Sequence, residues 1–89
     1  MTIEEVIDRA IITRQTIRIE YCTRYGNVFS CEITDIHYSN YYGGGYIQAY
    51  RLDIGEERTF KVSRIMTVNG HAFSRIFWHQ LGDYFRQIY

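Results

Sequence analysis

Apolar residues recur at intervals of three and four at the start of the chain, at Ile3, Val6, Ile7, Ala10 and Ile11. This spacing places them on one face of an α-helix. Thr2 and Glu5 are spaced as in a capping box, in which each side chain accepts a hydrogen bond from the other residue's backbone. The pattern predicts a helix over residues 3–14, and we assign residues 2–15 to an N-terminal helical region.

The apolar period then falls to two, which is the period of a half-buried β-strand. Alternation, or a short apolar run between turns, predicts strands at residues 16–23, 28–36, 45–52, 58–63 and 65–68. A tyrosine- and glycine-rich turn at 38–44 precedes the third strand, and an acidic turn at 53–57 precedes the fourth. Five short strands joined by tight turns are typical of a small, strongly bent sheet or barrel.

The turn between the first two strands decides how they pair. A two-residue Gly-Asn turn would place Cys22 opposite Cys31 and favour a disulfide between them. A three-residue loop at 25–27 instead pairs Ile19 with Ile33, which puts apolar side chains together. We therefore predict the three-residue loop, with the two cysteines on opposite faces and reduced.

Residues 74–88 show a second helical stripe, formed by Phe77, Leu81, Tyr84, Phe85 and Ile88. Aromatic residues also lie on other faces of this segment, and a surplus apolar face is typical of a partner surface. Two interpretations stay open. The helix is either a homodimer interface or a cap on the open end of the barrel.

The predicted order is α-β-β-β-β-β-α, a mostly β fold with flanking helices. A chain of 89 residues with 46% hydrophobic residues suits one folded domain. We therefore expect a single domain over residues 1–89, with a five-stranded barrel over 16–68.

The chain carries ten basic and ten acidic residues, so its formal net charge is zero. A basic field over the whole chain is excluded, and nucleic-acid binding would need a local patch. Nine of the ten basic residues are arginine, whose planar guanidinium suits phosphate groups and aromatic rings. The sequence has no signal-peptide pattern and no apolar run of membrane-spanning length, so we expect a cytoplasmic protein.

No arrangement of residues predicts catalysis. The serines lie in no GxSxG motif, and the run Gly43-Gly44-Gly45 matches neither a dinucleotide-binding loop nor a P-loop. The histidines, His37, His71 and His79, lack the spacing of metal ligands. We therefore expect no enzymatic activity, no cofactor and no metal.

The fourth predicted strand carries the main candidate site. In a regular strand, Arg58 and Arg64 share a face with Phe60 and Val62. A buried arginine without a partner is too costly, so each arginine must reach solvent, pair with a carboxylate or face an anion site. The carboxylates that would serve are those of Glu20, Glu32, Asp35 and Asp53.

An anion site would lie beside the tyrosines of the preceding strand, where Tyr46, Gln48 and Tyr50 share a face. Tyrosine rings are stacking surfaces for nucleic-acid bases, and they also serve as ordinary cross-strand packing. The candidate ligand-binding residues are Tyr46, Gln48, Tyr50, Arg58, Lys61 and Arg64.

These residues carry a resemblance to a known family. Tyr21, residues 45–50 (GYIQAY) and residues 58–65 (RTFKVSRI) resemble the WYL domain, over about residues 3–68. The family is named for a Trp-Tyr-Leu triplet, which here is Gly-Tyr-Ile, and the Arg-x-Phe-x-x-x-Arg-Ile pattern is the stronger match. Asp35 stands near the place of a proline that is often found in the family.

The resemblance implies an SH3-type, Sm-like barrel that senses ligands, most often in bacterial or phage transcription regulators. Some members bind single-stranded DNA, RNA or nucleotide-like ligands, and some tune CRISPR effectors. The family's pocket residues fall on Tyr46, Tyr50, Arg58 and Arg64. The chain has no helix-turn-helix motif, so we expect a stand-alone protein or an excised domain, and the Met1 start favours the first expectation.

We therefore expect a non-enzymatic regulatory module that binds single-stranded nucleic acid or a nucleotide-like anion. Through that ligand, or through a protein effector, it would modulate a transcription or CRISPR/defence-type system. The alternative is a protein-interaction or homo-oligomerisation scaffold with no nucleic-acid ligand.

Overall fold

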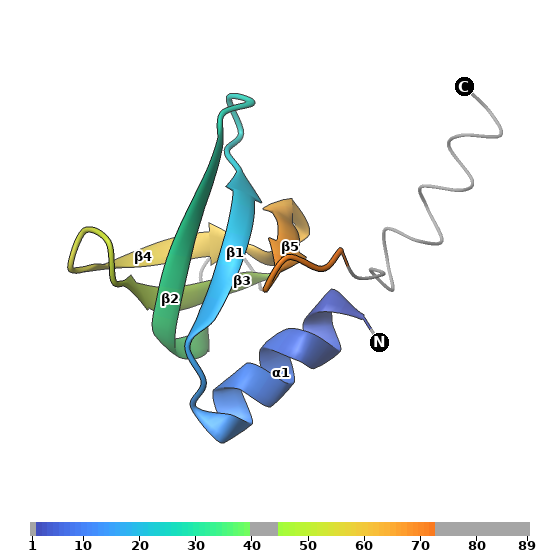
Figure 1. The fold of residues 1–89 in the computed structure, drawn as a ribbon, viewed down its shortest axis with the longest axis vertical. Coiled ribbons are helices and arrows are strands. Elements are labelled where there is room, and N and C mark those ends of the chain that lie inside the picture. Colours follow the sequence, from blue (N-terminus) through green and yellow to red (C-terminus); the bar gives the residue numbers. More distant parts are fainter. Residues whose placement is uncertain (1, 40–44, 73–89) are drawn as a thin grey trace, which may run out of the picture.

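The computed structural model describes residues 2–39 and 45–72 of the chain. Within them lie one helix and five antiparallel strands that form a single sheet (Figure 1). The elements are α1 (Ile3–Thr13), β1 (Ile17–Cys22), β2 (Val28–Ser39), β3 (Tyr46–Arg51), β4 (Glu56–Lys61) and β5 (Ile65–Val68). All five predicted strands are present, although β2 runs three residues further and β4 begins and ends two residues earlier. The predicted helix over 74–88 lies outside the described residues.

Helix α1 begins with the predicted capping box. The Thr2 hydroxyl accepts a hydrogen bond from the Glu5 N–H at 3.2 Å, and the Glu5 carboxylate accepts one from the Thr2 N–H at 3.4 Å. The helix ends at Arg14, whose backbone is left-handed with a φ of 56°. The predicted helix over 3–14 is confirmed to within one residue.

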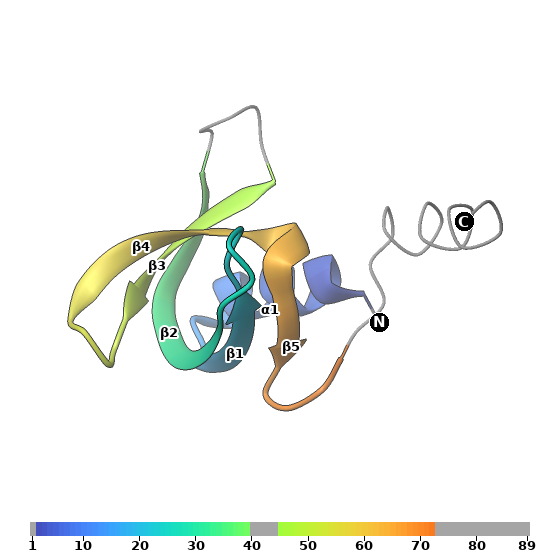
Figure 2. The same ribbon diagram turned by 90° about the horizontal axis from the view of Figure 1, so that it is seen from above.

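The strand order in the sheet is β4-β3-β2-β1-β5, so β4 and β5 are its two edges. The sheet bends strongly (Figure 2), and a single 3₁₀ turn, Val62–Arg64, joins β4 to β5. The two edges therefore meet at this turn. No ladder of hydrogen bonds joins them within the described strands, so the mostly β fold is confirmed while the sheet is open and not a closed barrel.

The first hairpin has a three-residue loop, but the loop lies one residue earlier than predicted. The Thr23 N–H donates to the Asn27 carbonyl at 2.8 Å, and the Gly26 N–H donates to the Thr23 carbonyl at 2.9 Å. The last position of such a loop needs a positive φ, and Gly26 supplies it at 87°. The predicted pairing of Ile19 with Ile33 is therefore wrong, and Ile19 pairs with Cys31.

This correction moves the register by two residues, so every side chain keeps its predicted face. Cys31 is buried and Cys22, which pairs with Val28, points to the opposite face. Both thiols are free, as the pattern predicted.

The core lies between α1 and one face of the bent sheet. Its fully buried large side chains are almost all isoleucine, namely Ile3, Ile7, Ile17, Ile19, Ile33, Ile47 and Ile65, with Val68. Burying one such side chain stabilises a fold by about 1.5–3 kcal/mol. The predicted helical stripe and strand alternation therefore supply the main driving force for folding.

A polar contact also holds α1 against the end of β2. The Tyr38 hydroxyl donates a short hydrogen bond to the Asp8 carboxylate. Partial burial and this neighbouring carboxylate raise the pKa of the Tyr38 phenol above its usual range. Tyr38 therefore stays neutral and donates throughout the physiological range of pH.

Strand β2 bends at Asp35, whose backbone is left-handed with a φ of 51°. The register with β3 shifts between Thr34 and His37, as in a β-bulge. The bend lets the first part of β2 pair with β1 and its last part pair with β3.

Replacing Asp35 by valine should lower the free energy of unfolding by about 1–2 kcal/mol, because a β-branched residue is strained at positive φ. Asp35→Gly should cost less, because glycine adopts this backbone freely. Thr34→Val is the matched control, since Thr34 lies in β2 without a positive φ, and it should change stability by less than about 0.5 kcal/mol. Urea denaturation measures all three variants. Equal losses at the two positions would contradict the bulge at Asp35.

Candidate functional site

The pairing of β3 with β4 separates the residues that the sequence placed in one site. Tyr46 pairs with Lys61, Gln48 with Thr59 and Tyr50 with Glu57, and these six side chains share one face of the two strands. Ile47 pairs with Phe60 and Ala49 with Arg58 on the other face. Arg58 therefore lies on the opposite face from both tyrosines. The predicted grouping was wrong because the buried residues of β3, Ile47 and Ala49, must share the face of Phe60.

Arg58 interacts with two residues of its own strand, Glu56 and Glu57. Its guanidinium forms an ion pair with the Glu56 carboxylate, and its Nη1 donates to the Glu57 carbonyl at 3.2 Å. About half of the Arg58 side chain is exposed, at 50%. The salt-bridge alternative therefore holds for this arginine, with a partner that the sequence interpretation had not considered.

Arg64 takes a different position, because β4 ends at Lys61 and the 3₁₀ turn interrupts the alternation. Val62 is buried in the core, while Arg64 is half-buried and its Nη1 donates to the Thr23 carbonyl at 3.3 Å. This bond joins the β4–β5 junction to the loop of the first hairpin.

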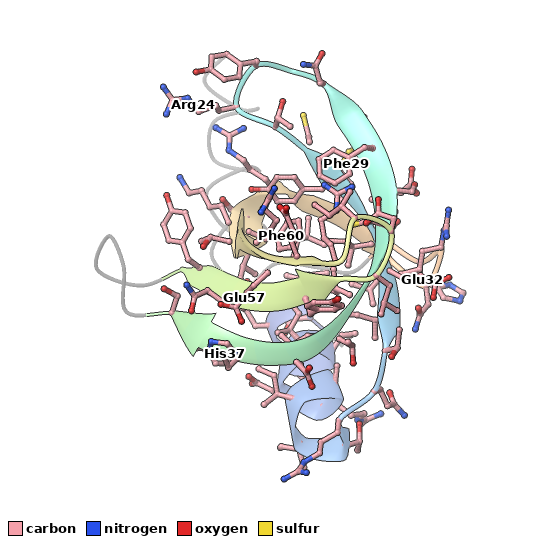
Figure 3. The ribbon with its side chains drawn as sticks, turned by 90° about the vertical axis from the view of Figure 1, so that its left-hand side faces the viewer. Arg24, Phe29, Glu32, His37, Glu57 and Phe60 are labelled. Atoms are coloured by element: carbon pink, nitrogen blue, oxygen red, sulfur yellow. The ribbon has the colours of Figure 1, made fainter. Side chains whose placement is uncertain are left out.

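The space between that hairpin and β3–β4 is a cleft of about 790 Å³. Its lining residues are Tyr21, Thr23, Arg24, Tyr25, Tyr46, Thr59, Lys61 and Arg64, and we call it the cationic cleft. Three of the six predicted ligand-binding residues, Tyr46, Lys61 and Arg64, line it. Figure 3 shows Arg24 at the tip of the β1–β2 hairpin.

Of the other three predicted residues, Arg58 lies on the opposite face, and Gln48 and Tyr50 lie on the same face of β3 as Tyr46 but do not line the cleft. Gln48 contacts His37, with 3.0 Å between the His37 Nε2 and the Gln48 Oε1. Tyr50 is exposed and follows Gln48 along the strand, away from Lys61.

Tyr21 is the lining residue that links the cationic cleft to the core. Its hydroxyl accepts a hydrogen bond from the Lys61 N–H at 2.9 Å. Its ring packs edge-on against Phe60 at 5.1 Å between centroids, and at 5.7 Å from Phe29. Phe29 and Phe60 lie toward each other in the interior of the bend (Figure 3). Tyr21 therefore connects the aromatic part of the core with the backbone of the cleft.

The cleft gathers positive charge. Three of its lining residues, Arg24, Lys61 and Arg64, are cationic, and among residues 2–39 and 45–72 no acidic side chain lines it. The ion pairs found within the described part of the chain lie elsewhere, at Arg18–Glu32, Arg51–Asp53 and Arg58–Glu56. A chain of zero net charge thus has a local positive field at this cleft.

Arg51 and Asp53 are partners in a structural contact outside the cleft. Arg51 lies over the Phe29 ring at 4.5 Å and donates two hydrogen bonds to Asp53, which lower the pKa of that carboxyl. Burial raises the pKa of the Cys31 thiol, which disfavours a reactive thiolate.

Across residues 2–39 and 45–72, no three His, Cys, Asp or Glu side chains are grouped so that they could hold a metal ion. Nor does this part of the chain contain a helix with the length and apolar character to cross a membrane.

The sequence interpretation did not include five of the lining residues in the site, namely Tyr21, Thr23, Arg24, Tyr25 and Thr59. A signal existed for those at the hairpin tip. The signal was Gly26, whose preference for positive φ sets the loop at 24–26 and places Arg24 and Tyr25 at its tip.

Tyr21→Phe should lower the free energy of unfolding by about 0.5–1.5 kcal/mol, because it removes the acceptor of the Lys61 N–H and keeps the ring. Tyr25→Phe is the matched control. It removes a hydroxyl from an exposed tyrosine of the same cleft and should change stability by less than about 0.5 kcal/mol. Urea denaturation compares the two. A Tyr21→Phe protein as stable as the wild type would contradict the role of this hydrogen bond.

Comparison with known proteins gives one match. The family model described as the WYL domain matches residues 2–69, a span that includes α1 and all five strands. No curated protein and no solved structure matches the chain.

Proposed function

The chain belongs to the WYL domain family, and from this premise we propose that it is a non-enzymatic module that binds an anionic ligand in the cationic cleft. Domains of this family are generally regulatory, ligand-binding parts of transcription or defence systems. The ligand that we propose is single-stranded nucleic acid or a nucleotide-like anion. The module would act in the cytoplasm on a transcription or CRISPR/defence-type system.

One observation carries this proposal, namely the cations of the cleft without carboxylates beside them. The arginines that serve the fold, Arg51 and Arg58, each have a carboxylate partner. Arg24, Lys61 and Arg64 face a cleft to whose lining the described part of the chain contributes no carboxylate. Cations gathered in this way attract an anion and hold it by charge-assisted hydrogen bonds.

The lining residues also suit the chemistry of a nucleotide. A guanidinium such as that of Arg64 offers five N–H donors, so it can bind a phosphate while one donor contacts the Thr23 carbonyl. Lys61 adds a point charge. The tyrosines supply stacking surfaces for bases.

The open, bent sheet is compatible with the Sm-like relationship that the family implies. A single 3₁₀ turn brings its two edge strands together, and the cationic cleft lies beside that junction. We propose that the fold is an incompletely closed barrel of this type.

The test is a fluorescence-anisotropy titration with a short labelled single strand at two salt concentrations. Binding should weaken as salt rises, because phosphate contacts release counterions. Lys61→Ala combined with Arg64→Ala should weaken binding at least about tenfold. Lys61→Ala alone, which changes only an exposed side chain, should show part of this loss.

Arg58→Ala is the matched control, because Arg58 is an exposed arginine of β4 on the opposite face. It should leave the affinity within about twofold of the wild type, since it removes no contact to the ligand. Salt-insensitive binding, or binding lost in Arg58→Ala and kept in the double variant, would contradict the proposal. A stable oligomer in light scattering that binds no strand would favour the interaction-scaffold alternative.

A further inference from the structure

The tip of the β1–β2 hairpin is a hydrogen-bonded turn at one side of the cationic cleft, and we call it the platform. Within the loop, the Asn27 N–H donates to the Thr23 hydroxyl at 3.1 Å, in addition to the two backbone hydrogen bonds that close the turn. On the cleft side, Arg64 donates to the Thr23 carbonyl. The residues between Thr23 and Gly26 are therefore held before any ligand arrives.

This platform presents a large exposed ring. Tyr25 is 78% exposed, and the Arg24 guanidinium lies 5.2 Å from the centre of its ring. Neither side chain supports the core. A tyrosine on a rigid turn is a stacking surface that loses little conformational entropy when a ligand binds.

We propose that Arg24 and Tyr25 form a base-stacking subsite of the cationic cleft, and that its ligand is a single strand with unpaired bases. This inference rests on the proposed function. One base stacks on the Tyr25 ring, and the adjoining backbone phosphates lie along Arg24, Lys61 and Arg64.

The shape of the cleft favours a strand over a free nucleotide. It is an open groove between the hairpin and β3–β4, with Tyr25 from one side and Tyr46 from the other in its lining. Pockets for free small ligands usually enclose most of the ligand surface. An open groove lined by both aromatic rings and cations suits a chain of alternating bases and phosphates.

A duplex does not fit this recognition, because its bases are stacked on one another and their faces are not available to Tyr25. A polyanion without bases would contact only the cations. These differences in ligand chemistry separate the stacking subsite from simple charge attraction.

The experiment titrates the full chain with two labelled DNA strands of equal length, one with mixed-sequence bases and one abasic throughout. The base-bearing strand should bind the wild type roughly tenfold or more tightly than the abasic strand. Tyr25→Ala should reduce the affinity for the base-bearing strand by roughly tenfold and leave the abasic strand unchanged, while Tyr25→Phe should restore the difference. Tyr50→Ala is the matched control, because Tyr50 is an exposed tyrosine that does not line the cleft, and it should bind both strands like the wild type.

The outcomes separate this inference from the proposed function. If both strands bind the wild type equally and Tyr25→Ala changes neither affinity, the stacking subsite is refuted while the anion-binding function stands. If neither strand binds, the proposed function fails and the subsite with it. Urea denaturation of Tyr25→Ala confirms that the exposed substitution leaves the fold intact.

Discussion

The hydrogen bond from the Lys61 N–H to the Tyr21 hydroxyl joins residues 40 positions apart in the chain. It holds the end of β4, an edge strand, against the first hairpin. The Arg64 bond to the Thr23 carbonyl makes a second link between the same two parts. Because the sheet is open at this place, the width of the cationic cleft depends on these two contacts and on the packing of Tyr21 against Phe60.

The same junction explains why charge collects there. If the strand continued regularly, Arg64 would lie on the same face as Val62, and burying its charge in the core there would be costly. The 3₁₀ turn lets Val62 enter the core while Arg64 faces the cleft. A local break in the strand thus keeps the charge of Arg64 out of the core and places it in the lining of the cleft. Arg58, which stays in the regular strand, has a neighbouring carboxylate instead.

Local patterns predicted much of the fold. The capping box at Thr2 predicted the start of α1, and the alternation of apolar residues predicted the five strands. Both signals depend on neighbouring residues alone. The hairpin register was wrong by two residues because the loop is set by the positive φ of Gly26, which outweighed the apparent match of Ile19 with Ile33. The bulge at Asp35 gave no signal, since aspartate is compatible with several turn conformations.

The site was harder to predict. The predicted faces were correct within β3 and for Arg58 and Phe60 in β4, but wrong for Arg64, which lies beyond the end of β4. The alternation also does not say which face of one strand meets which face of its neighbour. The buried pair Ile47 and Ala49 would have answered this, because they must share the face of Phe60. Arg24 and Tyr25 line the same cleft as Lys61 because of the tertiary arrangement of the bent sheet, which local patterns do not show.

NMR can decide whether the cationic cleft or the Arg58 face receives the ligand, through the amide chemical shifts recorded while a short DNA single strand is titrated into the protein. If the ligand binds in the cleft, the largest shift changes should occur at residues 23–26, at Tyr46 and at 61–64, with small changes at Glu56–Arg58. Large shifts at Glu56–Arg58 with none at 23–26 would contradict binding in the cleft.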